Sequence, residues 1–315
     1  MIKIFTIHLI IVLTNLVILA PKASATNNDP AKISIWKRKT GQHSENRVVG
    51  KSSVANLPLT GSKGLTVKIA SLTDIHYNKK ASYRGVLLAD LLRKYQSEHP
   101  LSSEDGVLLH FQNKMIIPVK LSVALNKRAK VLFAFETRPT TKSPWLREFT
   151  SVSKKDDLYQ DPRPLTFHGN KMALNKKTET YLTSKMNQPF SPWFYANSLV
   201  GIEYVNLDAY NKQFDLKGDQ QVKSGFKVFV RRCQYCHGIR YVGARYGWDF
   251  VEPIPIYKKR LKKDLHYHVK YPKAFALQKG LMMPNQLGFS EKEASDLWYW
   301  LKAAAKNQPK SYKAN

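Results

Sequence analysis

The chain has 315 residues, with 51 Lys and Arg against 23 Asp and Glu, so its formal net charge is +28. Hydrophobic residues make up 43% of the chain and charged residues 23%, a balance that excludes both a disordered chain and a multi-span membrane protein. The two cysteines, Cys233 and Cys236, lie close together in the sequence, which excludes a secreted scaffold held by disulfides. Basic residues outnumber acidic ones in both halves of the chain.

Residues 1–25 have the pattern of a secretory signal peptide. Lys3 precedes the apolar run Ile4–Ala20, and Ala23-Ser24-Ala25 fits a cleavage site. Cleavage there predicts a mature protein in the periplasm. The alternative is an uncleaved anchor that leaves the protein on the periplasmic side of the membrane, because the apolar run reaches the lower limit of about 17 residues for a bilayer span.

The mature chain begins with a polar arm, residues 26–62, and continues as a β-rich region over residues 63–210. Residues 65–70 alternate apolar and polar side chains, with Leu65, Val67 and Ile69 on one face, which predicts a half-buried strand. A helix is predicted from Gly85 to Tyr95. Short strands are predicted at 107–109, 115–119, 130–135 and 199–205, and the polar residues 151–188 are predicted to form a long surface excursion.

Residues 211–218 are predicted to be a linker, and a helix is predicted from Val222 to Arg232. Directly after it comes Cys233-Gln234-Tyr235-Cys236-His237, a C-x-x-C-H pentapeptide of the kind that attaches a c-type haem. On a helical turn the two thiols lie on one side and can form thioethers to the two vinyl groups of one porphyrin, and the next histidine is placed to bind the iron. We therefore predict one covalent haem c, bound by Cys233 and Cys236, with His237 as the proximal iron ligand and no catalytic residue.

Three other readings of the cysteine pair remain open. The first is a structural disulfide between Cys233 and Cys236. The second is a thioredoxin-like dithiol, although such a pair follows a strand, and this pair follows a predicted helix. The third is a zinc site, for which His266 and His268 have the wrong spacing.

The flanking residues resemble class I cytochromes c over residues 219–306. Gly225 and Phe229 precede the pentapeptide as in the first helix of that family, where the glycine lets this helix cross the last helix closely. Ser290 and Glu293 form a predicted capping box that opens a final helix. In that helix, Trp300-Leu301-Lys302 stands where the family usually has Tyr-Leu-Lys.

The resemblance also implies a distal iron ligand in the segment Gly280-Leu281-Met282-Met283-Pro284, where the family places a methionine before a proline. Met283 is the predicted ligand because it directly precedes the proline, and Met282 is the alternative. His266 or His268 would instead give a haem with two histidine ligands.

The implied fold class is two-domain, α+β: a β-rich N-terminal domain followed by an all-α cytochrome c domain, with residues 307–315 as a tail. The implied function is an electron carrier rather than an enzyme. The basic surface predicts acidic redox proteins as partners and possible association with the membrane surface, and no motif indicates a nucleic-acid partner. A haem-containing part of a periplasmic oxidoreductase and a haem-based redox or gas sensor are alternatives.

The first half weakly resembles sulfite-oxidase-like molybdopterin-binding domains, through the segment Ser82–Leu92. Members of that family that transfer oxygen hold molybdenum through a cysteine thiolate. This chain has no cysteine outside the haem motif. If the resemblance holds, it predicts a degenerate domain that serves as a scaffold or a docking module; an unrelated β-rich domain is the alternative.

Overall fold

The computed structural model describes residues 32–38, 51–58, 65–74, 79–99, 104–126, 128–138, 148–151, 165–168, 171–194, 196, 198–272 and 283–306. The predicted signal peptide, Met282 and the predicted tail lie outside these residues. The chain divides into one unit of residues 1–30 and a second of residues 31–315, and every described residue belongs to the second.

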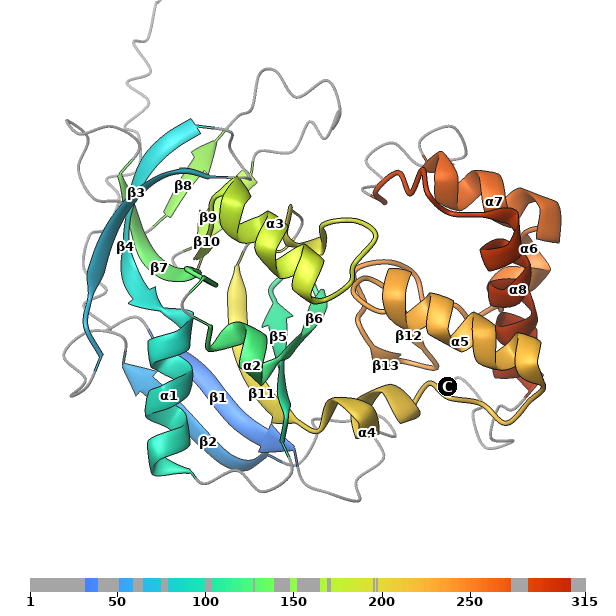
Figure 1. The fold of residues 1–315 in the computed structure, drawn as a ribbon, viewed down its shortest axis with the longest axis horizontal. Coiled ribbons are helices and arrows are strands. Elements are labelled where there is room, and N and C mark those ends of the chain that lie inside the picture. The colour runs from blue at the N-terminus through green and yellow to red at the C-terminus, as the bar shows by residue number, and fades with distance from the viewer. Residues whose placement is uncertain are drawn as a thin grey trace, which may run out of the picture. The chain divides into compact units, whose positions relative to one another are not determined.

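A five-stranded sheet forms the larger part of the first half, in the order β2-β1-β11-β5-β6 (Figure 1). Strands β1 and β11 are parallel, and the other neighbours are antiparallel. The predicted strand at 199–205 is confirmed as the central strand β11, in which Ile202 and Tyr204 are fully buried. The bounds are β1 (Lys32–Arg38), β2 (Lys51–Pro58), β5 (Gly106–Phe111), β6 (Ile116–Lys120) and β11 (Leu199–Val205).

A four-stranded antiparallel sheet has the order β10-β7-β4-β3. Its bounds are β3 (Lys68–Asp74), β4 (Lys79–Leu87), β7 (Leu132–Arg138) and β10 (Lys171–Ala173). The predicted buried face of the first strand is wrong: β3 is an edge strand, and the Ile69 side chain is 61% exposed. The predicted helix start at Gly85 is also wrong, because β4 pairs with β7 as far as Leu87.

Five short helices and a hairpin complete this half: α1 (Leu88–Glu98), α2 (Leu121–Ala124), α3 (Lys176–Lys185), the 3-10 helix η1 (Pro192–Phe194), α4 (Leu207–Lys212), and β8 (Glu148–Ser151) paired with β9 (Leu165–His168). The predicted surface excursion at 151–188 is wrong in its described part. Met172, Leu174 and Leu182 lie in the hydrophobic core, so β10 and α3 belong to the packed structure. The prediction failed because it followed the mostly polar composition of this stretch, although a few of its side chains are apolar and buried.

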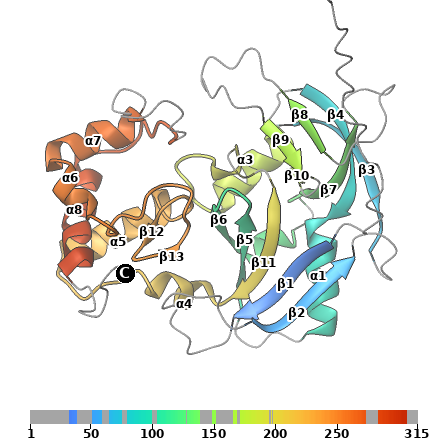
Figure 2. The same ribbon diagram turned by 180° about the vertical axis from the view of Figure 1, so that it is seen from behind.

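The later part of the chain contains α5 (Gln220–Arg232), β12 (Gly238–Ile239), β13 (Val242–Gly243), α6 (Ile256–Lys259), α7 (Lys262–Lys270) and α8 (Glu291–Lys306), seen from both sides in Figures 1 and 2. Helix α5 confirms the helix predicted from Val222 to Arg232, and α8 confirms the predicted final helix.

The predicted all-α character of this part is wrong, because β12 and β13 form an antiparallel hairpin immediately after the pentapeptide. Its turn is made by Arg240 and Tyr241, whose φ angles are 52° and 64°. Positive φ at both central residues matches the twist of a tight hairpin. The Asp249 carboxylate accepts hydrogen bonds from both turn N–H groups, at 3.0 and 2.6 Å, which stabilises this unusual backbone conformation.

The predicted fold class, a β-rich domain followed by an all-α domain, is therefore wrong for the described residues. Their hydrophobic clusters also cross the expected boundary between the two halves of the chain. Tyr235 and Cys236 belong to the cluster of the first half, and Leu108 and Val205 belong to that of the second. The described chain is therefore a mixed α and β fold with shared cores. The domain limits at 63–210, 211–218 and 219–306 stay predictions.

Helices α5 and α8 cross at Gly225. A Cβ atom at this position would collide with the Asp296 carbonyl oxygen and lie 2.6 Å from the Cβ of Trp300. One turn further along α5, the Phe229 ring stacks on the Trp300 indole with centroids 4.6 Å apart. Only a residue without a side chain allows this approach, so the family-like glycine has a steric role here.

We expect Gly225→Val to lower the free energy of unfolding by about 2 kcal/mol or more, because overpacking a helix crossing forces the backbones apart. The matched control is Gly288→Val, at an exposed glycine with no heavy atom within 4 Å of a built Cβ. Urea unfolding followed by circular dichroism measures both variants. Equal losses in the two variants would show that the close crossing is absent in solution.

Candidate functional site

The pentapeptide begins at the C-terminal cap of α5 and continues as a turn. The N–H groups of Cys236 and His237 donate to the Cys233 carbonyl oxygen at 3.1 and 2.9 Å. Both thiols are buried, and they are not joined to each other. Cys233 packs in the cluster that contains Phe229 and Trp300, whereas Cys236 packs in the cluster of the five-stranded sheet.

Burial raises the pKa of the Cys233 thiol and of the Cys236 thiol to about 12 each. The reactive form of a cysteine is the thiolate, and reactive cysteines lie in partly exposed, electropositive surroundings. The surroundings of this pair therefore oppose a redox-active dithiol. They are compatible with thioether bonds, which carry no charge.

His237 is held in one orientation. Its Nδ1 lies 2.8 Å from the Trp248 carbonyl oxygen, and its ring stacks on Phe250 with centroids 4.3 Å apart. Because a carbonyl oxygen only accepts hydrogen bonds, Nδ1 carries the proton and Nε2 keeps its lone pair in the neutral ring. A Cβ atom at Gly247 would lie 2.6 Å from Nδ1, so this glycine makes room for the ring.

An imidazole whose Nδ1 donates to a backbone carbonyl is the usual arrangement of a metal-binding histidine. Burial lowers the pKa of His237 and outweighs the opposite effects of the Trp248 hydrogen bond and the Asp249 charge. The ring is therefore neutral at physiological pH, which is the form that binds iron. This geometry fits the predicted proximal ligand of a haem.

Asp249 organises the loop that supplies the Trp248 carbonyl group. Besides the two hairpin N–H groups, its carboxylate accepts hydrogen bonds from the N–H groups of Val251 and Glu252, at 2.8 and 2.9 Å. Sequence reasoning missed this residue, because a lone aspartate in an aromatic-rich stretch resembles a solvated side chain. Its position among the turn-forming residues Gly243, Gly247 and Pro253 was the only signal.

The first half of the chain contacts the pentapeptide directly. The Ile116 N–H donates to the Tyr235 carbonyl oxygen at 3.2 Å, and the Arg245 N–H donates to the Lys114 carbonyl oxygen at 2.9 Å. The rings of Phe190 and Tyr235 meet edge to face, 5.9 Å between centroids. The β5–β6 hairpin therefore supports the pentapeptide.

Met283 is half-buried and packs against the same cluster as Cys233, and Met282 lies outside the described residues. Of the histidine alternatives, His266 has its Nε2 2.9 Å from the Phe289 carbonyl oxygen, a bond that iron binding at this atom would break. Burial, together with the charges of Arg260 and His237, lowers the pKa of His268 to about 4. Met283 and His268 both remain candidates for the distal ligand.

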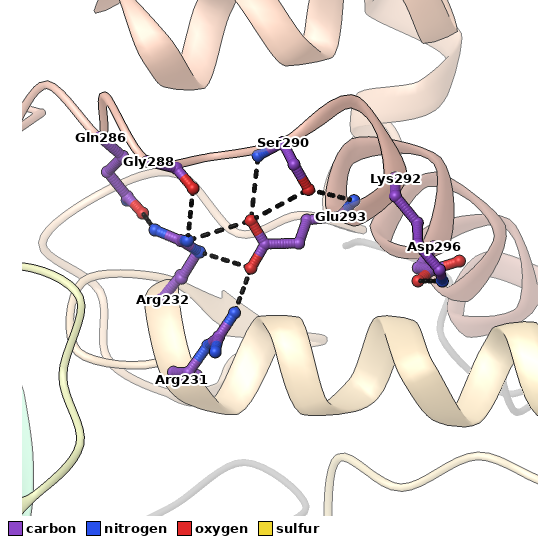
Figure 3. Close-up of polar contacts among 8 residues, drawn as sticks. All are labelled: Arg231, Arg232, Gln286, Gly288, Ser290, Lys292, Glu293 and Asp296. Atoms are coloured by element: carbon purple, nitrogen blue, oxygen red, sulfur yellow. Dashed lines mark hydrogen bonds and ion pairs between the residues drawn. The ribbon is translucent and has the colours of Figure 1, made fainter.

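Arg232, the residue before Cys233, connects α5 to the segment after Met283 and to α8 (Figure 3). Its buried guanidinium donates to Gln286 Oε1 at 3.3 Å and to the Gly288 carbonyl oxygen at 2.9 Å. It also donates to both carboxylate oxygens of Glu293, at 3.0 Å each. Sequence reasoning missed this residue, since a basic residue in a very basic chain carries no signal.

The predicted capping box is confirmed. The Ser290 N–H donates to Glu293 Oε2 at 3.0 Å, and the Glu293 N–H donates to Ser290 Oγ at 3.1 Å. Burial raises the pKa of Glu293, but the Ser290 hydrogen bond and the charges of Arg232 and Arg231 outweigh this, so the pKa lies below its ordinary value. The Glu293 carboxylate thus caps the N-terminus of α8 and neutralises the buried Arg232.

Within the described ranges, no three His, Cys, Asp or Glu side chains converge on a possible metal ion. The described helices include none that is long and apolar enough to cross a membrane. No protein-family model, curated protein or solved structure matches this chain. The resemblances to cytochromes c and to molybdopterin-binding domains therefore stay predictions from the sequence.

We expect Glu293→Gln to lower the free energy of unfolding by about 2 kcal/mol at neutral pH, because it leaves the buried Arg232 charge without a counter-ion. Since the folded state lowers the pKa of Glu293, its contribution is fully present above the ordinary value of 4.5 and is lost as the pH falls through the folded pKa. Urea unfolding at several pH values tests both points.

The control is Lys292→Gln, which removes an ion pair from a lysine side chain that is 80% exposed. Such a pair contributes less than about 1 kcal/mol. A difference between wild type and Glu293→Gln that does not shrink under acidic conditions would contradict the assigned role of the carboxylate.

Proposed function

We propose that the protein is an exported monohaem c-type cytochrome that carries single electrons between protein partners. The observation that supports this most strongly is the state of His237, which follows the C-x-x-C pair and is held neutral with Nε2 available by its bond to the Trp248 carbonyl group. The spacing of the pentapeptide and the orientation of its histidine are independent of each other. Both fit the same prosthetic group.

The roles follow from the residues present. Cys233 and Cys236 would hold the porphyrin through thioethers, His237 would bind the iron on one side, and Met283 would bind it on the other. A haem bound in this way takes up and releases one electron at its iron. The protein keeps His237 in a single tautomer and surrounds the pentapeptide with aromatic side chains, which exclude water and so influence the reduction potential.

The first half of the chain serves as a scaffold in this proposal. In its β5–β6 hairpin, the Ile116 N–H donates to the pentapeptide at Tyr235, and the Lys114 carbonyl group accepts from Arg245, in the segment that follows the pentapeptide. The predicted signal peptide places the protein in the periplasm, where acidic redox proteins are the expected partners. The excess of basic over acidic residues speeds encounter with such partners at low ionic strength.

Covalent attachment is tested by intact mass. The full-length gene is expressed in a bacterium that attaches c-type haem, and the purified protein is denatured before measurement. We expect a polypeptide heavier by the mass of one haem, and no added mass in the Cys233→Ser/Cys236→Ser double variant. A wild-type protein with the mass of its amino acids alone would disprove the proposal.

The distal ligand is tested with three variants of similar size: Met283→Leu, Met282→Leu and His268→Gln. A thioether ligand raises the reduction potential, so we expect the potential to fall in Met283→Leu and to stay unchanged in Met282→Leu and His268→Gln. Redox titration followed by absorption spectroscopy measures all three. A change in His268→Gln alone would replace Met283 by His268 as the ligand.

A further inference from the structure

An unusual share of the exposed apolar side chains lies near α6 and α7. Of the ten large hydrophobic side chains that are exposed among the described residues, seven lie between Trp248 and Tyr299. Leu261, which connects α6 to α7, is 60% exposed, and Trp248 is 54% exposed. Single exposed apolar residues need no explanation, but a contiguous group indicates an interaction site.

Two lysines that flank Leu261 contact two of these side chains, Trp248 and Tyr299. Lys259 Nζ lies 4.8 Å from the centre of the Trp248 ring, and Lys262 Nζ lies 4.9 Å from the centre of the Tyr299 ring. Leu261 lies between these two lysines in the sequence. Trp248, α6, Leu261 and the start of α7 are therefore neighbours, and we call them, together with Tyr299 and the exposed side of α7, the basic-aromatic surface.

Helix α7 continues this surface along its outer face. Leu265 and Val269, one turn apart, are buried against the rest of the protein. Lys263, Tyr267 and Tyr271 follow each other at the spacing of one helical turn on the opposite side and are exposed. The outer face of α7 thus begins with a basic side chain and continues with two aromatic side chains.

The charge of this surface is one-sided. Lys258, Lys259, Lys262 and Lys263 are all exposed, and the acidic residue nearest to them in the sequence, Asp264, is half-buried. Interfaces between proteins are depleted in lysine, because a flexible and strongly hydrated side chain is costly to bury. A lipid headgroup layer has no such cost, since lysine side chains extend along it while aromatic and aliphatic neighbours enter its apolar edge.

We propose that the basic-aromatic surface binds the face of an anionic lipid bilayer. The lysines supply attraction to the lipid phosphates, and Trp248, Leu261 and Tyr267 enter the headgroup region. The inference goes beyond electron transfer and does not depend on the haem. Binding can therefore be measured on chains with and without attached haem, which separates a failure of this proposal from a failure of the proposed function.

The experiment measures cosedimentation of the full chain with phosphatidylcholine vesicles, with and without phosphatidylglycerol. The test variant replaces Lys258, Lys259, Lys262 and Lys263 by Gln. The control replaces Lys212, Lys217, Lys223 and Lys227, which are also exposed, by Gln. Both variants have the same net charge and the same N-terminal apolar segment, so the two proteins differ only in the place of the lost charge.

We expect the wild type to bind only the anionic vesicles. The test variant should bind them at least about 100-fold more weakly, whereas the affinity of the control should stay within about threefold of wild type. Leu261→Ser should weaken binding about tenfold and leave the salt dependence unchanged. Equal losses in test variant and control would assign binding to the net charge alone and overturn the proposal. Failure of the wild type to bind anionic vesicles would also overturn the proposal. This includes the outcome in which the four lysines are needed for binding an acidic protein and not for binding lipid.

Discussion

The close crossing of α5 and α8 at Gly225 is the constraint on which the later part of the structure depends. Helix α5 ends at the pentapeptide, and α8 begins after the segment that carries Met283. The crossing therefore determines how far apart the two predicted sides of the iron site can lie. Arg232, at the end of α5, and Glu293, in the first turn of α8, form a further contact between the same two helices, through a charged pair that is largely removed from solvent.

Two features of the sequence determine the position and the orientation of His237: the spacing of the pentapeptide, and the loop after it that contains Trp248 and Asp249. Spacing in the pentapeptide places His237 after two cysteines, but does not orient its ring. The orientation comes from the Trp248 carbonyl group, and the backbone of that loop is held by the four hydrogen bonds to Asp249. A change at Asp249 would thus affect the ring without touching the motif.

The sequence predicted the features that have a regular period or a local cap: the helix ending at Arg232, the strand at 199–205, and the capping box of Ser290 and Glu293. It failed where tertiary pairing decides. Alternation placed Ile69 on a buried face, but β3 is an edge strand. The β12–β13 hairpin was missed because its turn, Arg240-Tyr241, lacks the usual glycine or asparagine and is stabilised by a carboxylate eight residues away.

Trp248 connects the candidate haem site to the basic-aromatic surface. Its backbone carbonyl accepts a hydrogen bond from His237 Nδ1–H, whereas its indole is exposed and lies under the Lys259 ammonium group. A partner that covers the indole would remove water from the loop that orients the histidine. Because hydrogen bonds strengthen as the local dielectric falls, docking at this residue would strengthen the bond that keeps His237 ready for iron. Trp248 therefore contributes its backbone to the candidate site and its side chain to the basic-aromatic surface.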